Sequence, residues 1–234
     1  MHPDAPPDRR RLALFGTLAV ALISVLVVVV GGDRPRWRTE GVGDPTTRGA
    51  VAYRDRENAF FQWGTELYMV PLLEGAYAEV TYVTQRGPED LRRLTQAIEA
   101  MLRRHTVVDL FLAVHGARTL PYLLADIDPA LRARLRLVYS TGCGDGHIGH
   151  WWLEMGADAF VGHHGQFSVS PVFLVYFLRR WSEGLSVAEA TQVANGQTAN
   201  RLGLVDALGL LELSLVDETV ARTQGDTTLR LGTP

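Results

Sequence analysis

The chain has 234 residues, which is enough for one full-sized domain with a short extension and too few for two large domains. Its net charge is −3, and a charged content of 21% beside a hydrophobic content of 47% is typical of a globular protein. No basic block is long enough to follow a nucleic-acid backbone, so we expect no nucleic-acid partner. All 23 basic residues are Arg, which excludes a catalytic Lys and Schiff-base chemistry on its amine.

Residues 1–11 form a short N-terminal tail that ends in three consecutive Arg, and the following residues 12–31 carry no charge. As a helix, the apolar run from Leu12 to Val30 would extend about 28 Å, close to the hydrocarbon thickness of a bilayer. The run is long for the core of a cleaved signal peptide, and Gly31 and Gly32 follow it in place of an A-x-A cleavage pattern. We therefore expect an uncleaved transmembrane signal anchor, with a cleaved signal peptide as the alternative.

The orientation of this anchor depends on the flanking charges. Arg residues stand on both sides of the apolar run, but the N-terminal tail is very short and its charges adjoin the expected helix. This favours a single-pass membrane protein whose globular domain lies outside the cytoplasm. Residues 32–50 are rich in Gly, Pro, Thr and Arg and are typical of a linker, which leaves residues 51–234 for the domain.

From residue 51 onward, short apolar runs alternate with amphipathic segments. Ser186 and Glu189 form the pattern of a capping box at the start of one helix. The alternation predicts an α/β domain with a mostly parallel sheet and helices on both faces. We expect strands at 77–83, 107–114, 135–140 and 159–162, and helices at 88–104, 120–135 (broken near Asp128), 146–155, 171–183 and after Ser186. Residues 195–234 are poorly explained, and 203–209 fit a turn or a strand of the same domain.

Two chemically reactive residues follow two consecutive expected strands. His115, with Gly116 after it, comes directly after the strand 107–114, and Cys143 follows the strand 135–140 in a glycine-rich segment. Their separation of 28 residues is sufficient for one right-handed strand–helix–strand crossover. Because the carboxyl ends of adjacent parallel strands meet at the same edge of a sheet, we expect His115 and Cys143 to lie close together.

The surroundings of Cys143 decide whether it is more than a packing residue. It is the single Cys of the chain, so it forms no intramolecular disulfide, and a lone Cys is most often a small buried apolar residue. Here it precedes an expected helix, whose N-terminus would favour the thiolate, and His115 would supply a base or a counter-charge. The glycines around Cys143 would let backbone amides point at a developing oxyanion.

An apolar strand ending in His-Gly, followed by a strand ending in Cys, resembles the caspase-like cysteine peptidases: caspases, metacaspases, legumains, gingipains, separases and CHAT domains. The downstream chain is most similar to CHAT domains, in which a Gly-Ala-x-x-x-Val strand precedes an aromatic-bearing helix and a Gly-x-Ser-x-x-Glu-Ala segment. Here these features correspond to residues 156–161, 173–177 and 184–190. The resemblance covers approximately residues 77–195, and it implies a caspase-like three-layer α/β sandwich.

The resemblance also implies a chemistry, which is peptide-bond hydrolysis without a cofactor. On it, His115 would act as general base or acid, Cys143 as nucleophile, and the backbone amides of Gly116 and Cys143 as the oxyanion hole. The expected partner is a peptide or protein substrate, for which Arg86 and Asp145 are candidate binding residues. Asp145 also fits the first turn of the helix. One departure from the family is that Thr141-Gly142 precedes Cys143, where Gln-Ala, Glu-Ala or Ser-Ala is commoner.

Two other functions compete with the peptidase. Four histidines, His147, His150, His163 and His164, could serve a metal hydrolase together with Asp145, Glu154 or Cys143, but their spacing matches no established metal signature, and we expect no metal. The other rival is a catalytically silent caspase-like module that binds a protein partner. An exposed aromatic patch would support that module; its possible members are Trp151, Trp152, Phe173, Tyr176 and Trp181.

Overall fold

The computed structural model describes residues 45–55, 62, 64–207 and 214–232. Its strands are β1 (Arg48–Arg54), β2 (Glu79–Thr84), β3 (Val107–Ala113), β4 (Leu135–Ser140), β5 (Ala159–His163) and β6 (Ala221–Gly225). They form one six-stranded sheet in the order β2-β1-β3-β4-β5-β6. All neighbours are parallel except β5 and β6, which are antiparallel. The expected mostly parallel α/β sheet is confirmed.

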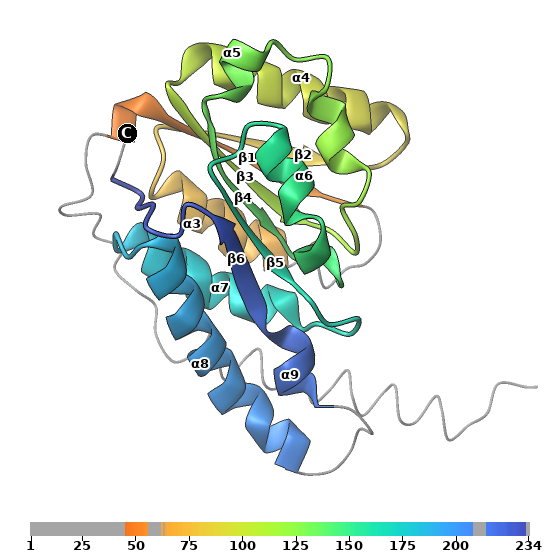
Figure 1. The fold of residues 1–234 in the computed structure, drawn as a ribbon, viewed down its shortest axis with the longest axis vertical. Helices are drawn as coiled ribbons and strands as arrows, with labels where there is room; N and C mark the ends of the chain where they lie inside the picture. The colour runs from red at the N-terminus through yellow and green to blue at the C-terminus, as the bar shows by residue number, and fades with distance from the viewer. Residues whose placement is uncertain (1–44, 56–61, 63, 208–213, 233–234) are drawn as a thin grey trace, which may run out of the picture. The chain divides into compact units, whose positions relative to one another are not determined.

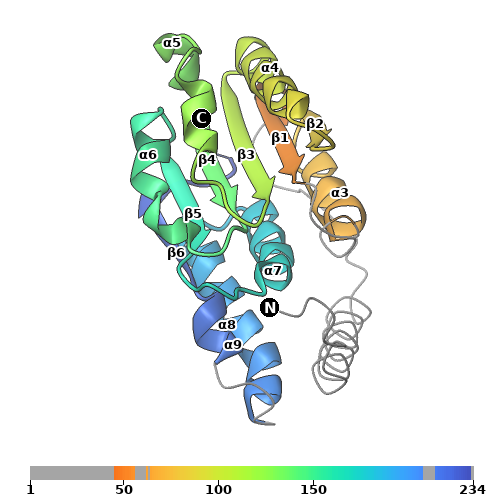
Figure 2. The same ribbon diagram turned by 90° about the vertical axis from the view of Figure 1, so that its right-hand side faces the viewer.

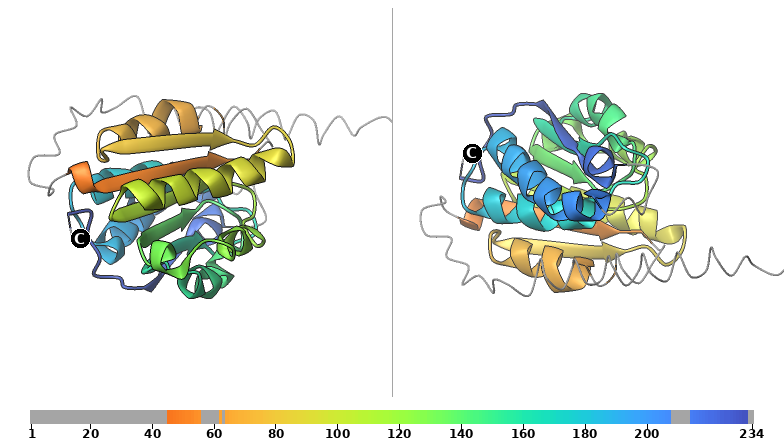
Figure 3. Two further views of the ribbon diagram at one scale, coloured as in Figure 1. Left: turned by 90° about the horizontal axis from the view of Figure 1, so that it is seen from above. Right: turned by 90° about the horizontal axis from the view of Figure 1, so that it is seen from below.

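Helices cover both faces of this sheet, so that the domain has three layers (Figures 1 and 2). One face carries α4 (Glu89–Arg104), α5 (Pro129–Arg132) and α6 (Gly149–Glu154), and the other carries α3 (Val70–Glu74), α7 (Ser170–Ser182) and α8 (Val187–Ala207). Figure 3 shows α4 in front of the sheet in one view and α7 and α8 in front of it in the opposite view. The remaining elements are short: η1 (Pro45–Thr47), η2 (Thr65–Met69), η3 (Leu120–Leu124), η4 (Asp145–His147) and α9 (Leu215–Thr219).

The central strands are hydrophobic because both of their faces are covered. Every residue of β1, β3, β4 and β5 is buried. On the α4 side, Leu94, Ile98 and Met101 pack against strand residues such as Leu110 in one continuous core. These helix residues recur at helical spacing, which is why the periodicity of the sequence identified α4 nearly to the residue.

The N-terminal boundary of the domain is earlier than residue 51. Strand β1 begins at Arg48, so residues 48–50 of the expected linker belong to the sheet. At the other end, the expectation of a turn or strand at 203–209 is wrong for residues 203–207, which are the last part of α8. Within the described residues, no helix is both long and apolar enough to cross a membrane. The expected anchor at residues 12–31 lies outside the described residues.

Candidate active site

The loops that carry His115 and Cys143 meet at the carboxyl edge of the sheet. Strands β3 and β4 are parallel neighbours, and each of the two residues follows the end of its strand. The backbone N–H of Cys143 donates a hydrogen bond of 3.2 Å to the carbonyl oxygen of His115. The Thr141 hydroxyl donates to the Val114 carbonyl oxygen and accepts from the Val114 N–H, which joins the same two strand ends once more.

Asp55 at the end of β1 joins this pair. Its carboxylate accepts a hydrogen bond from the backbone N–H of His115 at 2.7 Å, and its two oxygens lie 3.3 and 3.4 Å from the Nδ1 of the same residue. Asp55 therefore orients both the main chain and the ring of His115, with Nδ1 facing the carboxylate. Asp55 was not predicted from the sequence because β1 was not identified, although the strand-end rule that selected His115 applies equally to Asp55.

Asp145 lies beneath the two loops and connects them. It is fully buried, and its carboxylate accepts hydrogen bonds from the Ala117 N–H (2.9 and 3.1 Å) and from the Ser140 hydroxyl (2.6 Å). Burial is the main cause that raises its pKa. A buried carboxylate held in this way is not positioned to receive a substrate side chain, and it lies in the first turn of η4.

The same carboxylate explains the departure from the family at Thr141-Gly142. A Cβ atom at Gly142 would lie 2.0 Å from an oxygen of Asp145, which no real contact allows. Any larger residue before Cys143 would therefore displace Asp145 from the Ala117 amide. The missing side chain at Gly142 leaves space for the Asp145 carboxylate. The Thr141 hydroxyl hydrogen-bonds the carbonyl oxygen of Val114, the residue that follows β3.

The thiol of Cys143 is partly buried, and its surroundings do not favour the thiolate in the resting state. Burial is the main cause that raises its pKa, and the negative charges of Asp145 and Glu218 act in the same direction. The backbone N–H of Ser168 lowers the pKa but does not outweigh these effects. The expected stabilisation by a helix N-terminus fails because the segment after Cys143 is only the three-residue 3-10 helix η4.

The two backbone amides expected to bind the oxyanion differ in whether they already donate a hydrogen bond. The Cys143 amide is engaged by the His115 carbonyl oxygen, as described above. Gly116 is exposed and lines a cavity of about 580 Å³ beside the site. The described lining of this cavity is Tyr53, Asp55, Gln85, Leu91, Val114, Gly116, Thr119 and Leu120.

Arg86 lies at the margin of this region. It follows Gln85, a residue of the cavity wall, and its backbone N–H donates to Asp90 at 2.7 Å. Gln85 itself accepts a hydrogen bond from the Tyr53 hydroxyl at 2.7 Å. Burial and the charges of Asp55 and Asp90 raise the pKa of Tyr53 to about 12, so this hydroxyl stays a neutral donor at any physiological pH.

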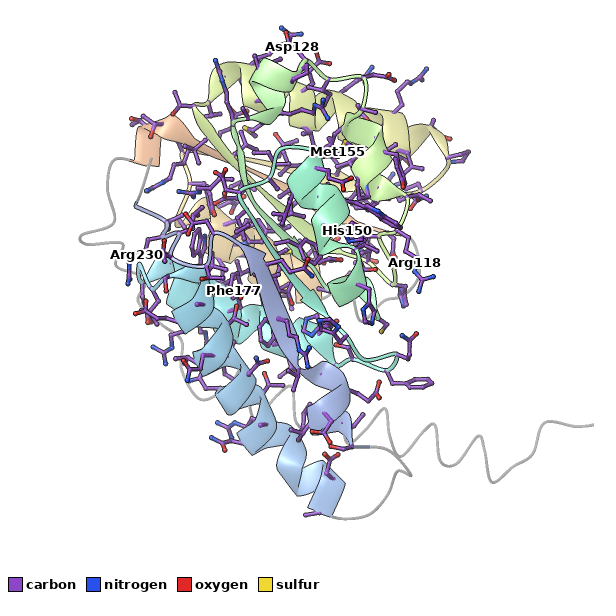
Figure 4. The ribbon with its side chains drawn as sticks, in the orientation of Figure 1. Arg118, Asp128, His150, Met155, Phe177 and Arg230 are labelled. Atoms are coloured by element: carbon purple, nitrogen blue, oxygen red, sulfur yellow. The ribbon has the colours of Figure 1, made fainter. Side chains whose placement is uncertain are left out.

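The histidine cluster does not converge on one point. His163 is fully buried, where its Nδ1 bonds the Thr219 carbonyl oxygen at 2.7 Å and its Nε2 lies 3.0 Å from the Tyr139 hydroxyl. The rings of His147 and His164 pack edge to face, with centroids 4.7 Å apart, and His150 is exposed on α6 (Figure 4). In the described part of the chain, no three His, Cys, Asp or Glu residues are placed to hold a metal ion.

The five aromatic residues considered for a binding surface, all of them described, do not form an exposed patch. Trp152, Phe173, Tyr176 and Trp181 are buried, and Trp151 is half-buried. The rings of Phe173 and Phe177 in α7 stack on Tyr139 of β4, and Figure 4 labels Phe177. These aromatics therefore belong to the core, and they give no support to a protein-binding surface.

Comparison with known proteins bears on the fold. No known protein-family profile matches the chain. No curated protein matches its sequence. The crystal structure of drICE, a caspase, is similar to this chain with a TM-score of 0.50 and 14% identity, over 86% of this chain and 99% of the drICE chain. The likeness supports the caspase-like fold and does not extend to the narrower resemblance to CHAT domains. The domain is thus a caspase-like α/β fold with a mostly parallel six-stranded sheet.

Proposed function

We propose that the chain is a cysteine peptidase that hydrolyses peptide bonds through His115 and Cys143. The observation that carries the proposal is that the His115 and Cys143 loops are hydrogen-bonded to each other at the carboxyl edge of a caspase-like sheet. Asp55 supports it, because a carboxylate on the Nδ1 side of an imidazole orients the ring and stabilises its protonated form.

The raised pKa of Cys143 determines the order of the proton transfers. Since the resting thiol is protonated at neutral pH, His115 takes the proton of Sγ as the sulfur attacks the peptide carbonyl carbon. A carbon–sulfur bond forms, and the carbonyl oxygen becomes an oxyanion. The protonated His115, beside Asp55, then gives its proton to the leaving amine as the carbon–nitrogen bond breaks. Water hydrolyses the resulting thioester and regenerates the thiol.

We assign the first oxyanion donor to the amide of Gly116, which lies at the cavity edge. The Cys143 amide would become the second donor after exchanging the His115 carbonyl oxygen for the substrate oxygen. The cavity of about 580 Å³ is then the place for a substrate side chain, with Arg86 at its margin. This size is within the range of small-ligand sites in proteins.

The test separates the peptidase from its two rivals. Peptide-library hydrolysis by the full-length chain should be lost after alkylation with iodoacetamide and unchanged by 1,10-phenanthroline at roughly millimolar concentration, because a thiolate and not a metal is the proposed nucleophile. Loss with the chelator alone would establish the metal hydrolase. The silent module predicts no hydrolysis under either condition and would overturn the proposal.

We further propose that residues 12–31 anchor the protein in a membrane with the domain outside the cytoplasm. The support is the uncharged length of this segment, which is sufficient to span the hydrocarbon layer. Alkaline carbonate extraction should leave the chain in the membrane pellet, and external protease should digest the domain in intact cells. Release into the supernatant, or full protection from the protease, would contradict the anchor or its orientation respectively.

A further inference from the structure

The cavity beside Gly116 combines an apolar wall with a polar one. Its described lining comes from the carboxyl ends of β1, β2 and β3 and from the first residues of the helices that follow β2 and β3. The aliphatic residues of this lining are Leu91, Val114 and Leu120, and its polar side chains are Tyr53, Asp55, Gln85 and Thr119. None of the described lining residues is Arg or His, so this part of the wall offers no cation to an entering side chain.

Gln85 is held by hydrogen bonds on both sides of its position in the chain. Its backbone N–H donates to the Arg54 carbonyl oxygen at 2.8 Å, which continues the pairing of β1 with β2. Directly after it, the N–H groups of Arg86 and Gly87 donate to the Asp90 carboxylate at 2.7 and 2.9 Å. The Gln85 side chain therefore lines the cavity from a backbone that is fixed before and after it.

Tyr53 sets the orientation of the Gln85 carboxamide. Tyr53 is 1% exposed, and its hydroxyl donates to Oε1 of Gln85 at 2.7 Å. Because this hydroxyl keeps its proton at any physiological pH, the carboxamide oxygen stays turned toward Tyr53. Among the described residues, Nε2 of Gln85 has no hydrogen-bond partner, so its N–H groups remain for a ligand.

The charges around this pair disfavour an acidic substrate side chain. Burial raises the pKa of Tyr53 most, and the negative charges of Asp55 and Asp90 raise it further. A carboxylate brought to the Tyr53 hydroxyl would be repelled by the same two charges. Arg86, next to Gln85, is exposed and is not one of the described lining residues.

A basic side chain would fit the charge of Asp55 but would oppose the proposed mechanism. During the attack, His115 becomes a cation beside Asp55, and a second cation at the same carboxylate would repel it. An uncharged carboxamide avoids both conflicts. Its oxygen can accept from Nε2 of Gln85, and its NH2 group can donate to the Tyr53 hydroxyl oxygen, whose own proton is engaged by Gln85.

We propose that this cavity binds a carboxamide side chain of the substrate, Asn or Gln, and that Gln85 determines the preference by donating a hydrogen bond from Nε2 to the amide oxygen. The inference rests on the proposed function, in which the scissile carbonyl is bound at Gly116. The aliphatic residues of the wall then contact the methylene groups of the bound side chain, and the polar pair contacts its end.

The experiment profiles each of the two residues that flank the scissile bond, in peptides that differ only at that residue. Gln, Glu and Met have similar lengths and differ in their end group, and Arg supplies the basic alternative. The full-length chain is compared with Gln85→Met, which removes the amide and keeps an unbranched side chain. Gln96→Met, at an exposed position of α4, is the matched control. The measured quantity is the ratio of kcat/KM between peptides.

At one of the two flanking residues, we expect the parent and Gln96→Met to favour the Gln peptide over the Met peptide roughly 10-fold, about what one hydrogen bond contributes, and to reject the Glu peptide more strongly. Gln85→Met should cleave the Gln and Met peptides equally and retain the parent rate on the Met peptide. A parent that prefers Glu, Arg or Met at both flanking residues, or a Gln85→Met that keeps the Gln preference, would overturn the proposal.

Gln85→Glu tests the donor separately from the shape of the cavity. The Tyr53 hydroxyl can still donate to the new carboxylate, but a negative charge replaces the N–H donor. The Arg peptide should gain on the Gln peptide by roughly 10-fold relative to the parent, since the new charge attracts a guanidinium. An unchanged ratio would show that the side chain at position 85 does not contact the substrate, and it would overturn the assignment.

A binding measurement distinguishes a failure of this proposal from a failure of the peptidase. If no peptide is hydrolysed, saturation-transfer NMR compares N-acetyl-glutamine methylamide with its methionine and glutamate analogues on the full-length chain and on Gln85→Met. Binding that is selective for the glutamine analogue and lost in Gln85→Met would support the cavity assignment and count against the peptidase alone. Absence of this selectivity would overturn the assignment. Circular dichroism melts verify that each variant is folded.

Discussion

At the scale of single residues, the site consists of groups whose chemistry depends on neighbours from other elements. His115 is held by Asp55 of the β1 end, and the Cys143 thiol is surrounded by Asp145 and Glu218, which oppose its ionisation. A thiol with a raised pKa needs a base to act as a nucleophile, as the proposed function requires of Cys143. His115 with Asp55 behind it fits that requirement.

Asp55→Asn tests this dependence. The amide oxygen can still accept the His115 N–H, but the negative charge beside Nδ1 is lost, so the protonated ring is less stable. We expect kcat to fall roughly 100-fold with little change in KM, the lower end of what a positioned base contributes. The measurement is steady-state hydrolysis across pH, with Asp126→Asn, an exposed carboxylate between η3 and α5, as control. An unchanged kcat would remove Asp55 from the mechanism.

His163 gives a prediction about stability in acid. Burial lowers its pKa to about 4 in the folded state, against about 6.5 in an unfolded chain. Below pH 6.5 the unfolded state takes up a proton that the folded state does not, so stability is lost as the pH falls from 6.5 to 4. The loss is about 3 kcal/mol in the free energy of unfolding.

Urea unfolding at several pH values between 7 and 4 measures this loss. His163→Gln should flatten the pH dependence in that range, although it is less stable at pH 7 because the Tyr139 and Thr219 bonds are disturbed. His150→Gln, on the exposed side of α6, should retain the parental slope. The same slope in His163→Gln as in the parent would show that another group is responsible.

At the scale of elements, the loops after β3 and β4 are held together by one buried carboxylate. Asp145 bonds the Ala117 amide of the first loop and the Ser140 hydroxyl of the second, and that hydroxyl also accepts from the Gly142 N–H at 3.1 Å. The two reactive residues therefore keep their spacing because of a residue that contacts neither a substrate nor the solvent. Its role is to position the loops.

Asp145→Ala should lower the free energy of unfolding by about 2–4 kcal/mol, since it leaves buried donors without acceptors. Peptidase activity should fall as well, because the His115 and Cys143 loops lose their connection. Thermal melts and kcat/KM at a temperature where the variant is folded measure the two effects. Unchanged activity in a folded Asp145→Ala would show that the loops are positioned without it.

The sequence predicted some of these elements much better than others. Strands β3 and β4 were identified within a residue because their runs are apolar without interruption, and the capping box at Ser186 and Glu189 is confirmed by reciprocal hydrogen bonds. Strand β1 was missed because it begins and ends in Arg, at positions 48 and 54, and looks like the preceding linker. Strand β6, Ala-Arg-Thr-Gln-Gly, is a polar edge strand and lacks any periodic signal.

The site residues also differ in how far the sequence could predict them. The strand-end rule selects His115 and Cys143 because it needs only the order of strands along the chain. Asp55 and Glu218 come from segments that are distant in sequence, and only the tertiary structure brings Asp55 to His115 and the charge of Glu218 near the thiol. The direction of the Cys143 pKa was predicted wrongly, because burial in the tertiary structure is the main cause that raises it and the charges of Asp145 and the distant Glu218 add to it.

At the scale of the whole molecule, the candidate site and the attachment of the C-terminal tail lie toward opposite ends of the strands. In Figure 4, Arg118, after the β3 end, and Arg230, in the C-terminal tail, mark these two ends. Toward the latter end, Arg136 forms a fully buried ion pair with Asp109 at 2.6 Å and donates to the Leu231 carbonyl oxygen at 3.0 Å. This network attaches the tail to the sheet.

Asp109→Ala should therefore destabilise the domain without changing the site. Removing one partner leaves the Arg136 charge buried and uncompensated, which costs about 3–5 kcal/mol. The double variant Asp109→Ala/Arg136→Met should recover part of this loss. Denaturant unfolding measures the stability, and Cys143 alkylation of the folded protein should proceed at the parent rate. A large change in alkylation would show that the two ends are coupled.

In the proposed mechanism, peptide hydrolysis depends on Cys143 and His115 together. Cleavage of a peptide library by the full-length chain tests this directly, beside Cys143→Ala, His115→Ala and the control His150→Gln. We expect cleavage by the parent and the control, and a loss of at least roughly 100-fold in each of the other two. Equal cleavage by the parent and Cys143→Ala would contradict it.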